Sequence, residues 1–197
     1  MMQRYSTIKL VPGAGLSLPV VASEAVKALH FIYAQKKIPF ALAFPSYAVE
    51  SGSDRKTLGD QVQVFTADES GLNVILDSLE VDDLLRSFVH PGRIRKVPEN
   101  WSGRWAAYVR FRIPNNNVRE ILPEYCKKGH AKVREFRTKK AEVLPFLHYR
   151  STSTGQKFAI HVEKKVYDEP LQAAGKPDSF GLSRTMSICA LPLLESA

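Results

Sequence analysis

The chain has 197 residues, of which 44% are hydrophobic, enough for a substantial core in one domain or two small ones. Its net charge is +8, and no apolar run is long enough to cross a membrane, so the composition does not indicate a membrane protein. The first residues enter a strand-like alternation without the apolar stretch of a secretory signal, and we therefore expect a cytoplasmic protein.

Strand and helix patterns alternate through the first half of the chain. Ser23 is a suitable N-cap for a helix that runs to Lys36 and carries one apolar face. The complete series of expected elements is a strand over 5–11, that helix, a strand over 39–44, a polar loop over 46–57, a strand over 61–65, a helix from Asp68 or Ser70, a further helical stretch around Leu84, Leu85 and Phe88, and a strand over 105–113. The order β-α-β-β-α-β predicts an α+β protein in which residues 1–113 form a ferredoxin-like domain.

Residues 114–197 are predicted to form a C-terminal region with a basic helical segment and a β-hairpin. Three asparagines at 115–117 indicate a turn, and helical structure is expected over 124–128 and again over 131–142, separated by Gly129. Apolar residues 144–149 and an alternating run from Phe158 then flank a polar loop, as in a hairpin. A last strand is expected near 186–194.

Most of the net charge lies in one segment. Residues 110–140 hold ten Lys or Arg and three Glu, a net charge of +7, so the rest of the chain sums to only +1. A concentrated basic segment on a near-neutral scaffold is typical of nucleic-acid binding, although a solvated basic helix would have the same composition. The cations concerned are Arg110, Arg112, Arg119, Lys127, Lys128, Lys132, Arg134, Arg137, Lys139 and Lys140.

The hairpin loop has an unusual composition. The residues Arg-Ser-Thr-Ser-Thr-Gly-Gln-Lys-Phe at 150–158 supply four hydroxyls, an amide, a glycine and two cations, and no carboxylate. Such a loop suits a polyanion, although an ordinary polar turn would explain the same residues.

Candidate metal ligands are poorly placed. Asp82 and Asp83 are adjacent, so on a helix they would point about 100° apart, and the two cysteines Cys126 and Cys189 have no zinc-ligand spacing, which favours free thiols. We therefore expect no metal and no cofactor. RNA can be cleaved without metal, because its own 2′-hydroxyl can attack the adjacent phosphorus when a histidine transfers the proton.

Several motifs in order along the chain resemble the CRISPR-associated endoribonucleases of subtype I-F. The hydroxyl-rich loop is the most specific of them, and the others are Lys27-Ala28-Leu29-His30, Ala43-Phe44-Pro45 and Phe180-Gly181-Leu182-Ser183. The resemblance implies a metal-independent enzyme that binds the hairpin of a CRISPR repeat and cleaves the precursor RNA at the 3′ base of the stem. It also implies that the enzyme keeps the hairpin and joins the other subunits of a type I-F surveillance complex.

The same resemblance assigns roles to individual residues. It implies that His30 is catalytic, that Ser151 anchors the nucleotide before the cut, and that Ser153 and Thr154 line the phosphate path. Phe158 matches an aromatic residue that packs against that nucleotide, and Phe180 stands where the family often has tyrosine.

The resemblance extends to two strand arginines, for which it implies a role in base recognition. Arg110 and Arg112 fall where the family reads bases at the foot of the stem, with Arg112 in place of a glutamine. Two other functions stay open at this point. The chain could be a non-catalytic subunit that holds an RNA hairpin, or an RRM-like binder, although the RNP1 pattern is absent.

Overall fold

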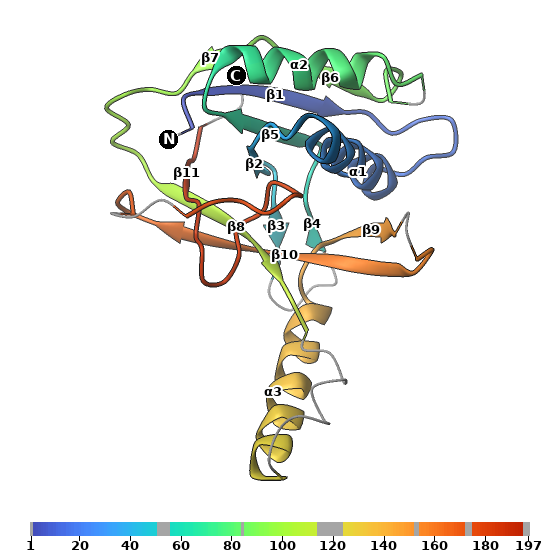
Figure 1. Ribbon diagram of the computed structural model, residues 1–197, viewed down its shortest axis with the longest axis vertical. Helices are drawn as coiled ribbons and strands as arrows, with labels where there is room; N and C mark the ends of the chain where they lie inside the picture. The colour runs from blue at the N-terminus through green and yellow to red at the C-terminus, as the bar shows by residue number, and fades with distance from the viewer. Residues whose placement is uncertain are drawn as a thin grey trace.

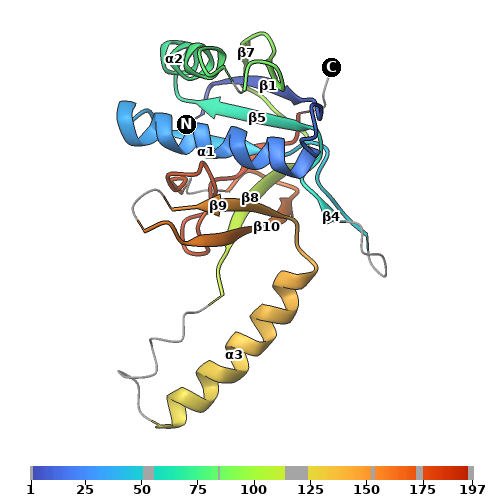
Figure 2. The same cartoon turned by 90° about the vertical axis from the view of Figure 1, so that its right-hand side faces the viewer.

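The computed structural model describes residues 2–50, 56–83, 85–113, 124–151, 154–171 and 175–194, without the side chains of 124–130. In chain order the elements are β1 (Arg4–Leu10), α1 (Leu18–Lys36), β2 (Phe40–Ala43), β3 (Ala48–Val49), β4 (Lys56–Thr57), β5 (Gln61–Thr66), α2 (Glu69–Glu80), β6 (Val89–Pro91), β7 (Arg95–Lys96), β8 (Trp105–Phe111), α3 (Glu124–Glu142), β9 (Phe146–Arg150), β10 (Lys157–Tyr167) and β11 (Leu191–Pro192). Two sheets lie one above the other, and α3 extends away from the second sheet (Figures 1 and 2).

The first sheet has the ferredoxin-like arrangement that the sequence predicts. Its strand order is β2-β5-β1-β6, with the short β7 also on β1, and neighbouring strands are antiparallel. In chain order β1, α1, β2, β5, α2 and β6 therefore give βαββαβ, and the α+β fold is confirmed. The alternating residues of β1 and β5 bury one face of the sheet, as Ile8 and Val62 do opposite each other.

The strand over 105–113 does not complete this unit, and that expectation is wrong. The fourth position is taken by the three-residue β6, while β8 belongs to a second sheet of order β11-β8-β10-β9. β8 pairs with β10 along its whole length, from Trp105 opposite Tyr167 to Phe111 opposite His161. Alternation along a strand shows that it is half-buried but does not identify its partner. Side chains of both sheets share one buried cluster, so the predicted division into 1–113 and 114–197 stays a prediction.

The helix α1 begins five residues before the predicted N-cap. Ser17 is the N-cap, Pro19 lies in the first turn, and Ser23 is buried inside the helix. The Ser23 hydroxyl donates to the carbonyl oxygen of Pro19 at 2.7 Å and accepts the backbone N–H of His148 at 3.0 Å. Ser23 therefore joins α1 to β9, which is a tertiary role that a capping pattern cannot distinguish.

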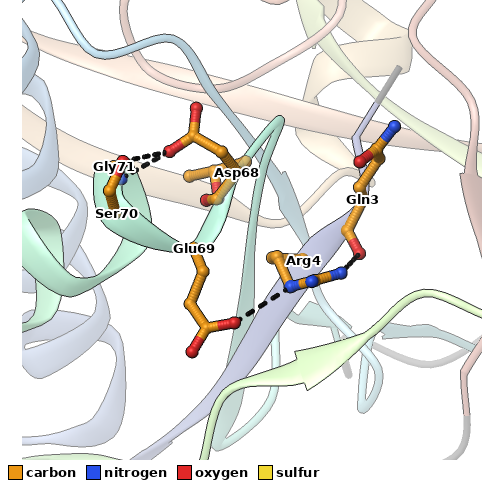
Figure 3. A network of polar contacts seen from close by, with 7 residues as sticks. Gln3, Arg4, Asp68, Glu69, Ser70 and Gly71 are labelled. Carbon is orange, nitrogen blue, oxygen red and sulfur yellow. Dashed lines mark hydrogen bonds and ion pairs between the residues drawn. The ribbon is translucent and has the colours of Figure 1, made fainter.

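The N-terminus of α2 follows the sequence more closely. Asp68 is the N-cap, and its carboxylate accepts hydrogen bonds from the backbone N–H of Gly71 and the hydroxyl of Ser70, both at 2.7 Å (Figure 3). These bonds lower the pKa of Asp68. Beside the cap, Arg4 Nε lies 3.2 Å from Glu69, which ties β1 to the first turn of α2 (Figure 3).

Other element boundaries differ from the expected ones. Residues 83–88 form turns in their described part rather than a helix, and residues 46–57 include the paired strands β3 and β4. α3 is continuous through Gly129, because its backbone can follow a helix at a modest cost in stability. The last strand is only two residues long. The predicted turn at 115–117 lies outside the described residues. Of the helices in the described part, none is long and apolar enough to cross a membrane.

Candidate active site

His30 lies on α1 at the edge of an aromatic cluster. Its ring stacks on Phe180 with centroids 4.0 Å apart and an interplanar angle of 6°, and it meets Tyr149 edge-on at 5.7 Å. The Nδ1 atom lies 3.0 Å from the carbonyl oxygen of Ser179. A carbonyl can only accept, so Nδ1 carries the proton and Nε2 of the neutral ring carries the lone pair. This hydrogen bond fixes both the tautomer and the orientation of the ring.

The loop over 178–183 positions Phe180 against His30. Asp178 Oδ1 accepts the backbone N–H groups of Phe180 at 2.9 Å and Leu182 at 3.1 Å, as in an Asx-turn. Gly181 has φ +71°, and a Cβ atom there would lie 2.5 Å from the ring of Phe40. Only glycine combines this backbone conformation with such a close approach.

The same loop is bonded to both sheets. The backbone N–H of Leu42 in β2 donates to the carbonyl of Gly181 at 2.8 Å, and that of Arg110 in β8 donates to the carbonyl of Ser183 at 2.9 Å. The position of Phe180 is therefore determined by β2 of the first sheet and β8 of the second.

Arg110 supports Phe180 from β8. Its guanidinium lies over the Phe180 ring, 4.9 Å from the centroid, and 3.6 Å from Asp178 Oδ2. The side chain of Arg110 is 19% exposed and that of Asp178 only 3%. Burial lowers the pKa of Arg110, and the nearby Asp178 carboxylate opposes that shift. The ion pair with Asp178 and the contact with the Phe180 ring hold Arg110 against the loop.

The hairpin β9–β10 brings the second part of the site to the cluster. Tyr149 pairs with Phe158 across the hairpin, their rings 5.0 Å apart, and Tyr149 also meets Phe180 edge-on at 5.1 Å. Ser151 follows two residues after Tyr149, just past the end of β9.

The loop beyond β9 is closed by its own backbone. The N–H of Ser151 donates to the carbonyl of Gln156 at 2.9 Å, and the N–H of Gly155 donates to the carbonyl of Ser151 at 2.8 Å. Ser151 Oγ accepts the N–H of Thr154 at 3.3 Å, and Thr154 is exposed. Ser153 lies outside the described residues. The backbone groups of Ser151, Gly155 and Gln156 thus close the loop, and Thr154 is exposed on it.

The basic helix α3 is anchored at its C-terminal end. Arg137 lies over the ring of Phe111 at 4.2 Å and its Nε donates to the carbonyl of Arg112 at 2.6 Å. Lys140 forms an ion pair with Glu163 on β10. Lys132 is exposed further along the helix, and Lys139 pairs with Glu135 at 2.9 Å on its surface.

Residues 5–192 match the family model described as CRISPR-associated protein (Cas_Csy4). The chain belongs to this family. Membership in the Cas_Csy4 family supports binding and processing of CRISPR RNA, as the motifs along the sequence predict. No curated protein matches the chain.

Solved structures resemble this Cas_Csy4 protein only weakly. A chlorite dismutase variant from Candidatus Nitrospira defluvii has 14% identity, covers 84% of this chain and 76% of its own, and gives a TM-score of 0.29. A structure described as an RAMP protein binding different RNA substrates has 10% identity, covers 98% and 96%, and gives the same TM-score of 0.29.

Three of the site residues predicted for this Cas_Csy4 protein, His30, Phe158 and Phe180, lie in one aromatic cluster. The residue that connects them, Tyr149, was not predicted as a site residue, and neither was the loop-holding Asp178. An acid two residues before Phe180 is an Asx-turn signal that could have identified Asp178. Arg119 and the side chains of Lys127 and Lys128 lie outside the described residues.

Other titratable groups are less suited to the site. The pKa of His161 on β10 is lowered by burial and by the charge of Lys56, and Cys189 is a buried free thiol whose pKa burial raises. Within the described part of the chain, no three or more His, Cys, Asp or Glu side chains gather as metal ligands would.

Proposed function

We propose that this protein is an endoribonuclease that binds the hairpin of a CRISPR repeat and cleaves precursor CRISPR RNA at the 3′ base of the stem. The observation that carries the proposal is the fixed imidazole of His30, with Nδ1 held by the Ser179 carbonyl and one ring face on Phe180. A histidine held in one tautomer is ready to transfer a proton at a defined atom.

The reaction is an internal transesterification of the RNA. Nε2 of His30 takes the proton of the 2′-hydroxyl, the 2′-oxygen bonds to the adjacent phosphorus, and the bond from phosphorus to the 5′-oxygen breaks. The leaving 5′-oxygen takes a proton from solvent, so the products are a 2′,3′-cyclic phosphate and a 5′-hydroxyl. Ser151 and Thr154 hold the ribose and phosphate in line for the attack, and Ser153 also contacts the phosphate. Orientation of this kind lowers the barrier without any covalent contribution from the protein.

The cluster gives the remaining site residues their roles. Phe180 and Tyr149 fix the plane of the His30 imidazole by stacking and edge contact, and Phe158 extends the apolar wall beside the nucleotide. Phe180 needs only its ring for this role, so the absence of a tyrosine hydroxyl is compatible with catalysis. Arg110 acts mainly as a positioning residue through Phe180 and Asp178.

RNA binding is assigned to α3 and the end of β8. Lys132, Arg134, Lys139 and the predicted Arg119, Lys127 and Lys128 contact phosphates of the stem, while Arg137 and Lys140 hold the helix on the second sheet. Arg112 is exposed just beyond β8 and recognises the foot of the stem. The protein keeps the cleaved hairpin and joins the other subunits of a CRISPR surveillance complex.

Incubation with a repeat RNA in excess EDTA tests the proposal. We expect one cut at the 3′ base of the stem at the rate seen with Mg²⁺, because the 2′-hydroxyl mechanism needs no metal. Tight binding without any cut would instead favour the non-catalytic hairpin-binding subunit. A requirement for Mg²⁺ at an intact, folded hairpin would contradict the mechanism.

Replacement of single arginines or lysines separates base recognition from phosphate contact. Arg112→Ala is expected to cost about 1–3 kcal/mol of binding free energy for the native stem and to relax the preference at one base pair. Lys132→Ala should weaken all hairpins equally and flatten the salt dependence. The measurement is a binding panel over stem-base variants at several salt concentrations, with Arg110→Ala as a third protein. Identical profiles for Arg112→Ala and Lys132→Ala would show that Arg112 does not read sequence.

A further inference from the structure

A groove of about 440 Å³ lies between α1 and the β9–β10 hairpin, next to the His30 cluster. Glu24 and Lys27 of α1 line one side, and the hairpin contributes the other. The hairpin residues that line it are His148, Tyr149, Arg150, Lys157 and Phe158. The groove is in the size range of pockets that hold small organic groups, about 300–1,000 Å³.

The groove combines cations with aromatic rings. Lys27, Arg150 and Lys157 supply three positive charges against the single carboxylate of Glu24, which is paired with Lys27 at 2.8 Å. The rings of Tyr149 and Phe158 form the apolar part and are in contact with each other. Both rings are half-buried. A positive groove lined with aromatic rings is the arrangement that binds single-stranded nucleic acid, because unpaired bases stack while the cations hold the phosphates.

Tyr149 makes the groove continuous with the proposed reaction site. Its ring touches His30 and Phe180 as well as Phe158. Figures 1 and 2 show α1 and α3 on opposite sides of the second sheet, so the groove lies on the side away from the basic helix. An RNA whose stem follows α3 and whose cut lies at His30 therefore continues past the cut toward the groove.

We propose that this groove binds the single-stranded RNA immediately downstream of the cut, stacking its first base on Tyr149 or Phe158 and holding its phosphates with Lys27 and Lys157. This inference rests on the proposed function, because it uses the position of the stem and of the cut. The groove would hold the leaving strand in line during the reaction, and its carboxylate, Glu24, limits how tightly that strand is held.

The test compares two RNAs that carry a 2′-deoxy nucleotide before the cut, one ending at the stem and one with a short single-stranded 3′ extension. For the parent protein the extension should strengthen binding. The double variant Lys27→Ala/Lys157→Ala should bind the extended RNA about tenfold more weakly than the parent protein does. Because two phosphate contacts are lost, the slope of log affinity against log salt concentration should fall by about 1.4. The affinity of the variant for the extension-free hairpin should equal that of the parent. Glu24→Gln should increase the affinity that the 3′ extension adds.

The matched control is Lys9→Ala/Lys36→Ala, which removes one exposed strand lysine and one exposed helix lysine outside the groove. It should keep the full gain from the extension. The assignment would be overturned if the 3′ extension strengthened binding equally in the groove variant and the parent, or if the groove variant lost as much affinity for the extension-free hairpin. It would also be overturned if only a 5′ extension strengthened binding. Cleavage of the natural repeat by the parent protein is measured in a separate assay. A negative result for the groove can therefore be distinguished from a negative result for the proposed function.

Discussion

His30→Ala is expected to slow cleavage of the repeat RNA by at least about a hundredfold while the hairpin still binds. Proton transfer by a positioned side chain contributes about 10²–10⁴ to a rate, and among the described residues His30 is the histidine that stacks on Phe180. The measurement is a single-turnover rate with saturating enzyme, alongside a binding constant on the uncleavable RNA.

His90→Ala is the matched control for that variant. His90 is an exposed histidine on β6, outside the aromatic cluster, and its removal should leave the rate unchanged. If His30→Ala cleaved at the parent rate, the imidazole of His30 would have no role in proton transfer and the proposed mechanism would be wrong.

Asp178→Ala is expected to lower the free energy of unfolding by about 3 kcal/mol or more, and to reduce cleavage as well. The substitution removes the acceptor for two backbone N–H groups and leaves the half-buried Arg110 without its carboxylate. Urea denaturation gives the stability change, and the cleavage rate at low temperature, where the variant stays folded, gives the effect on the site.

Asp178→Asn separates the two contributions. An asparagine keeps an oxygen that can accept from Phe180 and Leu182, but it removes the charge opposite Arg110. We expect a smaller stability loss and a rate closer to that of the parent protein. Equal stability of Asp178→Ala and the parent would contradict the view that this side chain holds the loop.

The sequence predicted the elements of the first sheet better than their partners. The strand patterns of β1, β5 and β8 are visible along the chain, although β5 and β8 bury residues on both faces of their sheets. These patterns do not show that β8 pairs with β10 rather than with β1, since pairing depends on contacts between residues at least fifty positions apart. Ser23 shows the same limit, because its hydroxyl serves β9 instead of capping its own helix.

Short motifs predicted some residues of the candidate site, whereas residues that reach it only through tertiary contacts were not predicted. His30 and Phe180 were identified through short motifs, and the structure brings them to 4.0 Å although they are 150 positions apart. Tyr149 reads as an ordinary apolar strand residue, and its role follows only from the packing of three elements around its ring. The internal engagement of Arg110 depends equally on a loop whose path the sequence does not reveal.

The central claim is that the RNA supplies its own nucleophile and His30 removes its proton. The most direct measurement is the cleavage of two repeat RNAs in excess EDTA, identical except for a single 2′-deoxy nucleotide immediately before the cut, with mass spectrometry of the upstream product. The account predicts that the all-ribose RNA ends in a 2′,3′-cyclic phosphate and that the deoxy RNA binds equally well but stays intact. Cleavage of the deoxy RNA at a comparable rate would contradict it.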